Sequence, residues 1–228
     1  MPPPQMVGGN QQDEYAKLVP WLTKVLHDSG TYGLMERFGI DPLPFVLTLT
    51  KSESDFKQRV VSPMNAFGFM QLLVPTARRV CSAEKTSVES MLERRISCGS
   101  ITGQTLKDDW KLNIVLGTLY LKKHVEEFGS RVAGLKRSLD EKGKVLINLI
   151  SGAYNAGEGA LRKYLARMDR SGRSLDDIDP RQSVIPYNET ENYVRKIQRW
   201  YGTFRTWIDA RTDAIAAGQP GPVVGPRV

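Results

Sequence analysis

Apolar residues recur every three or four positions along most of the chain, the spacing that places them on one face of an α-helix. Two apolar stripes are the clearest, and they comprise Tyr15, Leu18, Trp21, Leu22 and Val25 near the start and Tyr193, Ile197, Trp200, Tyr201, Phe204 and Ile208 near the end. No segment sustains the alternation of apolar and polar residues that is typical of a half-buried strand. The pattern therefore predicts an all-α protein.

Proline and glycine mark the ends of the predicted helices. These helices span residues 12–30, 40–54, 74–84, 87–96, 105–129 and 189–218, with two more inside 143–168 joined at 155–159. Pro42, Pro44 and Pro75 suit first helical turns, and Gly30 and Gly129 are the expected stops. The helix at 40–54 is apolar nearly all round, so we expect it to lie at the centre of the core.

The two ends of the chain differ from its middle. Residues 1–12 and 218–228 are rich in proline and glycine and hold little to bury, which predicts flexible tails. Residues 13–217 are then one compact domain. We recognise no apolar run long enough to cross a membrane and no secretory leader. The export route is left open between a processed protein, delivery with a virion and a secretion-associated route.

Composition and charge narrow the classes of partner. The chain of 228 residues is 40% hydrophobic with a formal net charge of +7, which favours an anionic partner such as cell-wall polymer, lipid or nucleic acid. A nucleic-acid partner is supported by the charge and by nothing else, since the sequence has neither zinc-finger spacing nor an RRM-type aromatic motif. Cys81 and Cys98 are too few for a disulfide framework. We expect two free thiols, with a single disulfide as the alternative.

A run of apolar and threonine residues, Leu47 to Thr50, leads directly to the carboxylate of Glu53. An apolar surround disfavours the ionised form of a carboxyl and raises its pKa, so Glu53 is a candidate general acid. Glycosidic bond cleavage is a usual task for such a residue. Asp55 is a poor second carboxylate, because residues two apart on a helix point away from each other. A single acid suffices if the substrate supplies its own nucleophile.

Four blocks of sequence occur in a recognisable order. They are ESDFKQRVVSPMNAFGFMQLLVPTA at 53–77, WKLNIVLGTLYL at 110–121, SGAYNAGEGAL at 151–161 and IPYNETENYVRKI at 185–197. Together they resemble the signature of the soluble lytic transglycosylase family over about residues 44–197. The resemblance implies a lysozyme-like (goose-type) α-helical domain that cleaves the β-1,4 bond between N-acetylmuramic acid and N-acetylglucosamine of peptidoglycan. The muramoyl 6-hydroxyl replaces water and leaves a 1,6-anhydro product.

The resemblance also assigns residues by position. Glu53 matches the catalytic acid and base, and Tyr154 the tyrosine whose hydroxyl approaches it. The remaining matches to substrate-binding positions are Ser62, Met70, Gln71 and Asn155. No metal or organic cofactor is implied. The implied partner is peptidoglycan in the bacterial periplasm or cell wall, and some family members serve larger secretion, conjugation or phage-entry assemblies.

The block around Ser62 departs from the family pattern. Asn65 stands where glycine is usual, and Phe67 and Phe69 replace smaller or aliphatic residues beside Gly68. Asparagine tolerates left-handed backbone, so these changes bear on subsites more than on the acid. Three alternatives stay open: a lysozyme-type hydrolase, an inactive peptidoglycan-binding relative that serves as an anchor or scaffold, and a nucleic-acid binder.

Overall fold

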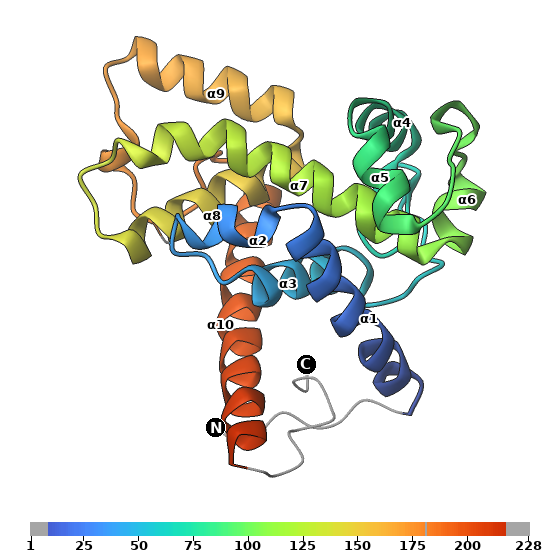
Figure 1. Cartoon of the computed structure of the whole chain (residues 1–228). Helices are drawn as coiled ribbons and strands as arrows, with labels where there is room; N and C mark the ends of the chain where they lie inside the picture. The colour runs from blue at the N-terminus through green and yellow to red at the C-terminus, as the bar shows by residue number, and fades with distance from the viewer. Residues whose placement is uncertain (1–8, 181, 218–228) are drawn as a thin grey trace.

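The computed structural model describes residues 9–180 and 182–217, and it confirms the all-α class (Figure 1). The α-helices are α1 (Gly9–Asp28), α2 (Thr31–Glu36), α3 (Pro42–Ser54), α4 (Val74–Ala83), α5 (Lys85–Leu92), α6 (Gly103–Asp108), α7 (Trp110–Ala133), α8 (Leu139–Ala156), α9 (Glu158–Arg170) and α10 (Asn188–Ala216). Two 3-10 helices accompany them, η1 (Cys98–Ser100) and η2 (Leu175–Asp177). The predicted tails lie outside the described residues, except that residues 9–12 open α1.

Helix α3 is buried on nearly every side, as its apolar composition predicts. Phe45, Val46, Leu47 and Leu49 are fully inaccessible, and α3 packs against α10, α1 and α2. Pro42 and Pro44 stand in its first turn, where the missing amide hydrogens cost nothing. Its last turn reaches the surface of the domain and carries Glu53 there. No described helix is long and apolar enough to cross a membrane.

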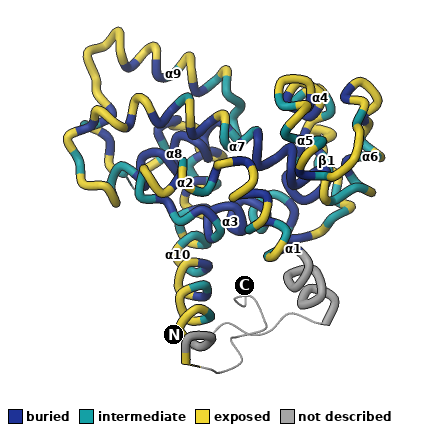
Figure 2. Tube along the Cα trace, viewed as in Figure 1, coloured by how far each residue is buried: buried dark blue, intermediate teal, exposed yellow. Residues whose placement is uncertain are grey.

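Helix α7 is contacted by α1, α2, α4, α5, α6 and α8. Helix α8 lies along α7, α9 contacts α8, and α4, α5 and α6 gather at the other end of α7 (Figure 1). Figure 2 shows the inner turns of α3, α7 and α8 as buried and much of α9 as exposed. The predicted helix at 105–129 is divided at Asp109, whose carboxylate caps α7 by accepting from the Leu112 amide at 3.0 Å.

The prediction that Gly129 ends its helix is wrong. Helix α7 continues to Ala133, and Gly129 is buried where a Cβ atom would lie 2.5 Å from Cζ of Phe38. This glycine therefore allows the Phe38 ring to approach the helix, and nothing in the local sequence distinguishes that role from a helix stop. The prediction of two helices joined at 155–159 is confirmed, with Gly157 at φ +86° between α8 and α9.

A small antiparallel hairpin links α3 to α4. Strands β1 (Ala66–Phe67) and β2 (Leu72–Leu73) pair Ala66 with Leu73 and Phe67 with Leu72. Two-residue strands are too short to show a period-two pattern, which is why the sequence does not predict them. Asn65 adopts left-handed backbone at φ +57° in the turn before β1, as expected of an asparagine in place of glycine.

The side chain of Asn113 fixes this hairpin to α7. Fully buried, it accepts from the Met70 amide at 2.8 Å and donates to the Phe67 carbonyl at 2.8 Å. A Cβ atom on Gly68 would lie 2.5 Å from the Asn113 amide nitrogen, so only glycine fits beside it. The hairpin is thus held at a fixed position next to the end of α3.

The expectation of two free thiols is wrong, because Cys81 and Cys98 form a disulfide. Helix α4 packs against η1, which brings the two Cα atoms to 5.5 Å, within the range that a disulfide requires. The bond closes a loop with a sequence separation of 17. The spacing of the two cysteines along the chain does not reveal this pairing. The pairing depends on how the chain from α4 through α5 returns to place η1 against α4.

Candidate active site

A cleft of about 420 Å³ opens at the point where α3 ends. Its lining comes from the end of α3, the hairpin, α7, the joint between α8 and α9, and the start of α10. Five of the six residues predicted for the site line it, namely Glu53, Ser62, Gln71, Tyr154 and Asn155. Segments far apart along the chain therefore converge on one cavity around Glu53.

Glu53 is partly buried at this cleft, in the last turn of α3. Burial raises the pKa of its carboxyl to about 7, although a hydrogen bond from Tyr193 and the charge of Lys196 both act to lower it. The Tyr193 hydroxyl donates to Oε1 of Glu53, and Lys196 Nζ donates to the neighbouring Ser52 carbonyl at 3.0 Å. Near neutral pH the carboxyl is thus divided between its protonated and ionised forms.

Glu53 is the single carboxylic acid among the described residues that line the cleft. Asp55 takes left-handed backbone at φ +54° at the end of α3, away from this lining. Burial acts to raise the pKa of Asp55, but its ion pairs with Lys51 and Lys57 outweigh burial and lower the pKa overall. Asp55 is therefore a paired anion, whereas the raised pKa of Glu53 keeps part of its population protonated near neutral pH.

The hydrogen-bond partner of Glu53 is Tyr193, whereas Tyr154, whose hydroxyl the resemblance places near this carboxyl, lines the same cleft and feels its charge. Tyr154 donates instead to the Met70 carbonyl at 3.1 Å, which ties α8 to the hairpin. Burial raises the pKa of both tyrosines well above 10, and the nearby charge of Glu53 raises them further. Both hydroxyls are thus neutral donors. The ETENYV block contains Tyr193, but its place in an apolar helical stripe is typical of a core residue.

Ser62 and Gln71 are held by the hairpin while they face the cleft. The Ser62 hydroxyl accepts from the Ala66 amide at 3.0 Å, so its own hydrogen stays free to donate. Gln71 Nε2 donates to the Gly68 carbonyl at 2.8 Å and the Val60 carbonyl at 3.3 Å. Both hydrogen bonds use the amide nitrogen, and the amide oxygen remains an acceptor for a ligand. The turn role and the cleft role of these residues coexist.

Met70 does not line the cleft, in contrast to the prediction from its position. Its side chain is fully buried, with Sδ 3.3 Å from the Thr50 hydroxyl and its methylene carbons against Gly117. Its backbone carbonyl is the acceptor for Tyr154. Met70 therefore supports the wall of the cleft from within the core. A methionine between polar motif residues gives no sequence signal that separates these two roles.

Neither histidine nor cysteine occurs among the described residues of the cleft lining. Elsewhere in the described part of the chain, one group of side chains has the composition of a metal site, and it comprises His124, Glu127 and Glu158. The cleft lining offers one carboxyl, several hydroxyls and two side-chain amides, which are suited to proton transfer and hydrogen bonding. Fold and site together define an all-α domain with a cleft in which one glutamate is the single carboxylic acid among the described lining residues.

Comparison with known proteins identifies the family to which this chain belongs. Residues 33–176, well over half of the chain, match the model described as the transglycosylase SLT domain, so this protein belongs to that family. The match includes three of the four sequence blocks on which the resemblance rests. The fourth block, 185–197, carries Tyr193 and lies beyond the matched residues.

Two bacterial relatives are named soluble lytic murein transglycosylase. That of Escherichia coli strain K12 is 28% identical over 182 residues, which are 79% of this chain and 23% of the relative. That of Salmonella typhimurium strain LT2 is 28% identical over 166 residues, 72% of this chain and 21% of the relative. The chain thus spans about a quarter of the length of the curated relatives that it matches.

Two solved structures are also similar. One is an inactive mutant of the lytic transglycosylase Slt from Pseudomonas aeruginosa, with a TM-score of 0.48 and 20% identity over 89% of this chain and 25% of that one. The other is the 70 kDa soluble lytic transglycosylase of Escherichia coli, with a TM-score of 0.48 and 22% identity over 95% of this chain and 32% of that one.

Proposed function

We propose that this protein is a peptidoglycan lytic transglycosylase that cleaves the β-1,4 bond between N-acetylmuramic acid and N-acetylglucosamine without water. One observation carries the proposal: Glu53 is the one acidic side chain among the described residues of the cleft, and its pKa is raised to about 7. Membership of the SLT family supports the substrate class. A general acid is most effective when its pKa lies near the operating pH, which this value satisfies.

The reaction proceeds in two proton transfers at one carboxyl group. Glu53 first donates its proton to the glycosidic oxygen, the bond to the anomeric carbon breaks, and the leaving sugar departs with a new hydroxyl. The Glu53 carboxylate then accepts the proton of the muramoyl 6-hydroxyl as that oxygen bonds to the anomeric carbon. The product carries a 1,6-anhydro ring, and Glu53 is again protonated.

Tyr193 serves the second of these steps. Its neutral hydroxyl donates to Oε1 of Glu53 and stabilises the carboxylate that the first transfer creates. Burial and this hydrogen bond oppose each other, so the acid gives up its proton without becoming permanently ionised. Tyr193 therefore sets how readily Glu53 alternates between acid and base.

A second carboxylate is not required by this mechanism. A hydroxyl of the substrate that is already held near the anomeric carbon has a very high effective concentration, which a free water molecule lacks. The Ser62 hydroxyl, the Gln71 amide oxygen and the Asn155 amide line the cleft beside Glu53 and suit the hydroxyl and acetamido groups of the sugars. Their task in this proposal is to hold the glycan in that geometry.

The proposed place of action is the bacterial cell wall. The disulfide between Cys81 and Cys98 supports an oxidising compartment such as the periplasm. The net charge of +7 favours attraction to an anionic wall polymer. Residues 13–217 act as one catalytic domain in this proposal, and association with a larger envelope-spanning assembly is a further part of it.

Digestion of purified murein sacculi tests the proposal. We expect the wild type to release soluble fragments that are one water lighter than lysozyme products, whereas Glu53→Gln releases almost none. Fragments with only reducing ends would replace this mechanism by hydrolysis. Binding to sacculi without any release would identify an inactive anchor. Retention on DNA with a steep salt dependence, without binding to sacculi, would favour a nucleic-acid binder.

A further inference from the structure

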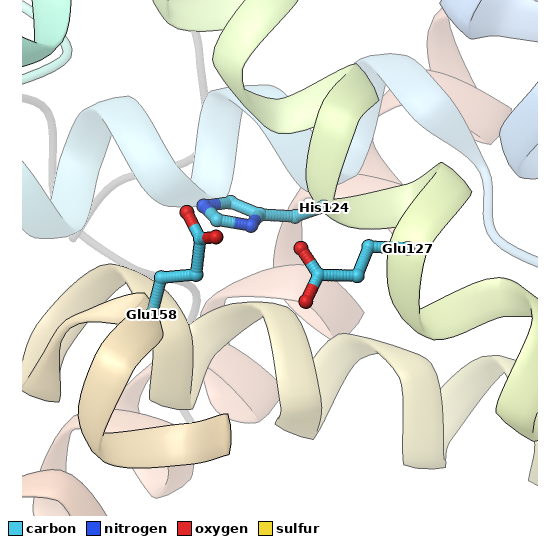
Figure 3. Close-up of side chains that lie close together, drawn as sticks. All are labelled: His124, Glu127 and Glu158. Atoms are coloured by element: carbon cyan, nitrogen blue, oxygen red, sulfur yellow. The ribbon is translucent and has the colours of Figure 1, made fainter. Parts of the chain in front are cut away.

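Three potential metal ligands converge between α7 and α9, outside the cleft. His124 and Glu127 lie one turn apart on α7, and Glu158 begins α9. Each offers one ligand atom, and these atoms all lie within 4.8 Å of one another. Figure 3 shows the imidazole of His124 lying between the two carboxylates. Residues three apart on a helix share a face, so the placement of the pair on α7 follows from the sequence.

The imidazole of His124 is buried without a hydrogen-bond partner. Its exposed fraction is 0%, and neither Nδ1 nor Nε2 has a partner. Oε2 of Glu127 is buried and unpartnered as well. Buried polar atoms are nearly always paired, because an unpaired one loses the hydrogen bonds that water would have made. These atoms therefore point to a ligand that satisfies them.

The orientation of the imidazole is fixed by rings on both sides. Tyr120 contacts it edge-on at 4.3 Å between ring centroids, and Phe128 stacks with it at 5.8 Å. A ligand site is more effective when its side chains are already held in place. The packing holds His124 toward the two glutamates even though it forms no hydrogen bond there.

Two basic side chains cover the outside of the cluster. Arg162 contacts Oε1 of Glu127 at 2.8 Å and Oε1 of Glu158 at 2.5 Å, and Lys123 contacts Glu158 at 3.0 Å. The side chains of Arg162 and Lys123 are 56% and 45% exposed, so either can turn into solvent at little cost. They compete with a cation for the carboxylates but leave His124 unsatisfied.

We propose that His124, Glu127 and Glu158 bind a divalent transition-metal ion of the Zn²⁺ type. One imidazole nitrogen and two carboxylate oxygens form a mixed ligand set that suits Zn²⁺, whereas Mg²⁺ and Ca²⁺ prefer oxygen alone. Three protein ligands leave a fourth tetrahedral position for water. The sequence-based expectation of no metal concerned the reaction in the cleft, and this site lies behind the cleft wall.

The bound ion would fasten α9 to α7. Glu158 follows Gly157, which lines the cleft, and Tyr120 both lines the cleft and packs on His124. A link across the two helices therefore restrains the joint between α8 and α9. The expected consequence is a more stable domain with an unchanged proton-transfer site, and it does not depend on the proposed glycan chemistry.

Titration of the metal-free wild-type protein with Zn²⁺ alone tests the proposal, by calorimetry and by the visible spectrum of Co²⁺ as a substitute ion. We expect one ion per chain, a tetrahedral Co²⁺ spectrum that Zn²⁺ abolishes, and a higher melting temperature with Zn²⁺ than with Mg²⁺ or Ca²⁺. His124→Phe, which keeps the ring packing, and Glu127→Gln should each weaken binding by about tenfold or more. Arg162→Gln should bind about fivefold more tightly, because it removes the competing cation.

The matched control is Glu126→Gln on the same turn of α7, an exposed glutamate that pairs with Lys122 at 3.9 Å. It should bind Zn²⁺ as the wild type does. Absence of binding at millimolar Zn²⁺, or equal affinities in the wild type and in Glu127→Gln, would overturn the proposal. Glu127→Gln alters a partly exposed side chain, so it keeps the test decisive if His124→Phe does not fold.

Discussion

The cleft at Glu53 and the cluster at His124 each hold a titratable group removed from water, yet their surroundings differ. Glu53 faces an open cavity, receives one hydroxyl hydrogen bond and has no other acid in the described lining. His124 is enclosed, lies between two carboxylates, and makes no hydrogen bond through either ring nitrogen. Burial favours the neutral form of both groups, and it moves their pKa values to about 7 and about 4.

Burial thus gives the two groups opposite chemical properties. A carboxylic acid kept neutral holds a proton that it can give, whereas an imidazole kept neutral holds a lone pair that it can share. The open cavity beside Glu53 lets a substrate receive the proton. The cluster around His124 sets an imidazole beside two carboxylates and is suited to an ion. Changes in the cleft should therefore alter turnover, and changes along α7 should alter stability or metal binding.

The largest expected effect is on turnover. Glu53→Gln should reduce the release of murein fragments by about a thousandfold, because the amide can neither donate the acidic proton nor accept one. The fold should persist, since Tyr193 can still donate to the amide oxygen. Asp55→Asn, which changes a paired carboxylate outside the cleft lining, is the control and should retain near-normal turnover. Equal loss in both variants would mean that Glu53 has no special role.

The same substitution should stabilise the protein at alkaline pH. The native pKa of Glu53 is about 7 against 4.5 unperturbed, so above pH 4.5 the unfolded chain loses this proton before the native state does. The free energy of unfolding therefore falls as the pH rises from about 4.5 to about 7. Near pH 8, Glu53→Gln should restore up to about 3 kcal/mol of it. Urea unfolding at pH 8 and pH 4 measures this difference, which should vanish at the lower pH.

Substitutions along α7, away from the cleft, should change stability without changing turnover. Gly129→Ala places a Cβ atom against the Phe38 ring and should lower the free energy of unfolding by about 2 kcal/mol. Gly134→Ala adds the same methyl group in open space just after α7 and should change stability by less than about 0.5 kcal/mol. Thermal unfolding compares the two variants, and their turnover at low temperature should match the wild type.

The smallest expected effect is a change in the pKa of Glu53. Tyr193→Phe removes a hydrogen bond that lowers the pKa of Glu53, so that pKa should rise. The alkaline limb of the pH–rate profile should then move to higher pH, and turnover at neutral pH should fall by about tenfold. Tyr187→Phe alters an exposed tyrosine and is the control. An unmoved alkaline limb would show that Tyr193 supports packing only.

The sequence by itself determined the features that depend on neighbouring residues. Helix α3 is apolar nearly all round, and this pattern predicted its central burial and made Glu53, in its last turn, a candidate general acid. The joint at 155–159 followed from glycine between two amphipathic stretches. Such features follow from backbone propensity and periodicity, which act within a few residues and are therefore readable from one segment at a time.

Only the tertiary structure decided which side chains meet across the fold. Tyr193 reaches Glu53 from 140 positions away, Cys81 meets Cys98 because α4 packs on η1, and Met70 lies in the core although its neighbours line the cleft. The convergence of His124 with Glu158 likewise requires α9 to fold back along α7. These contacts depend on how whole helices pack, and their free energies are shared among many residues, so no single segment encodes them.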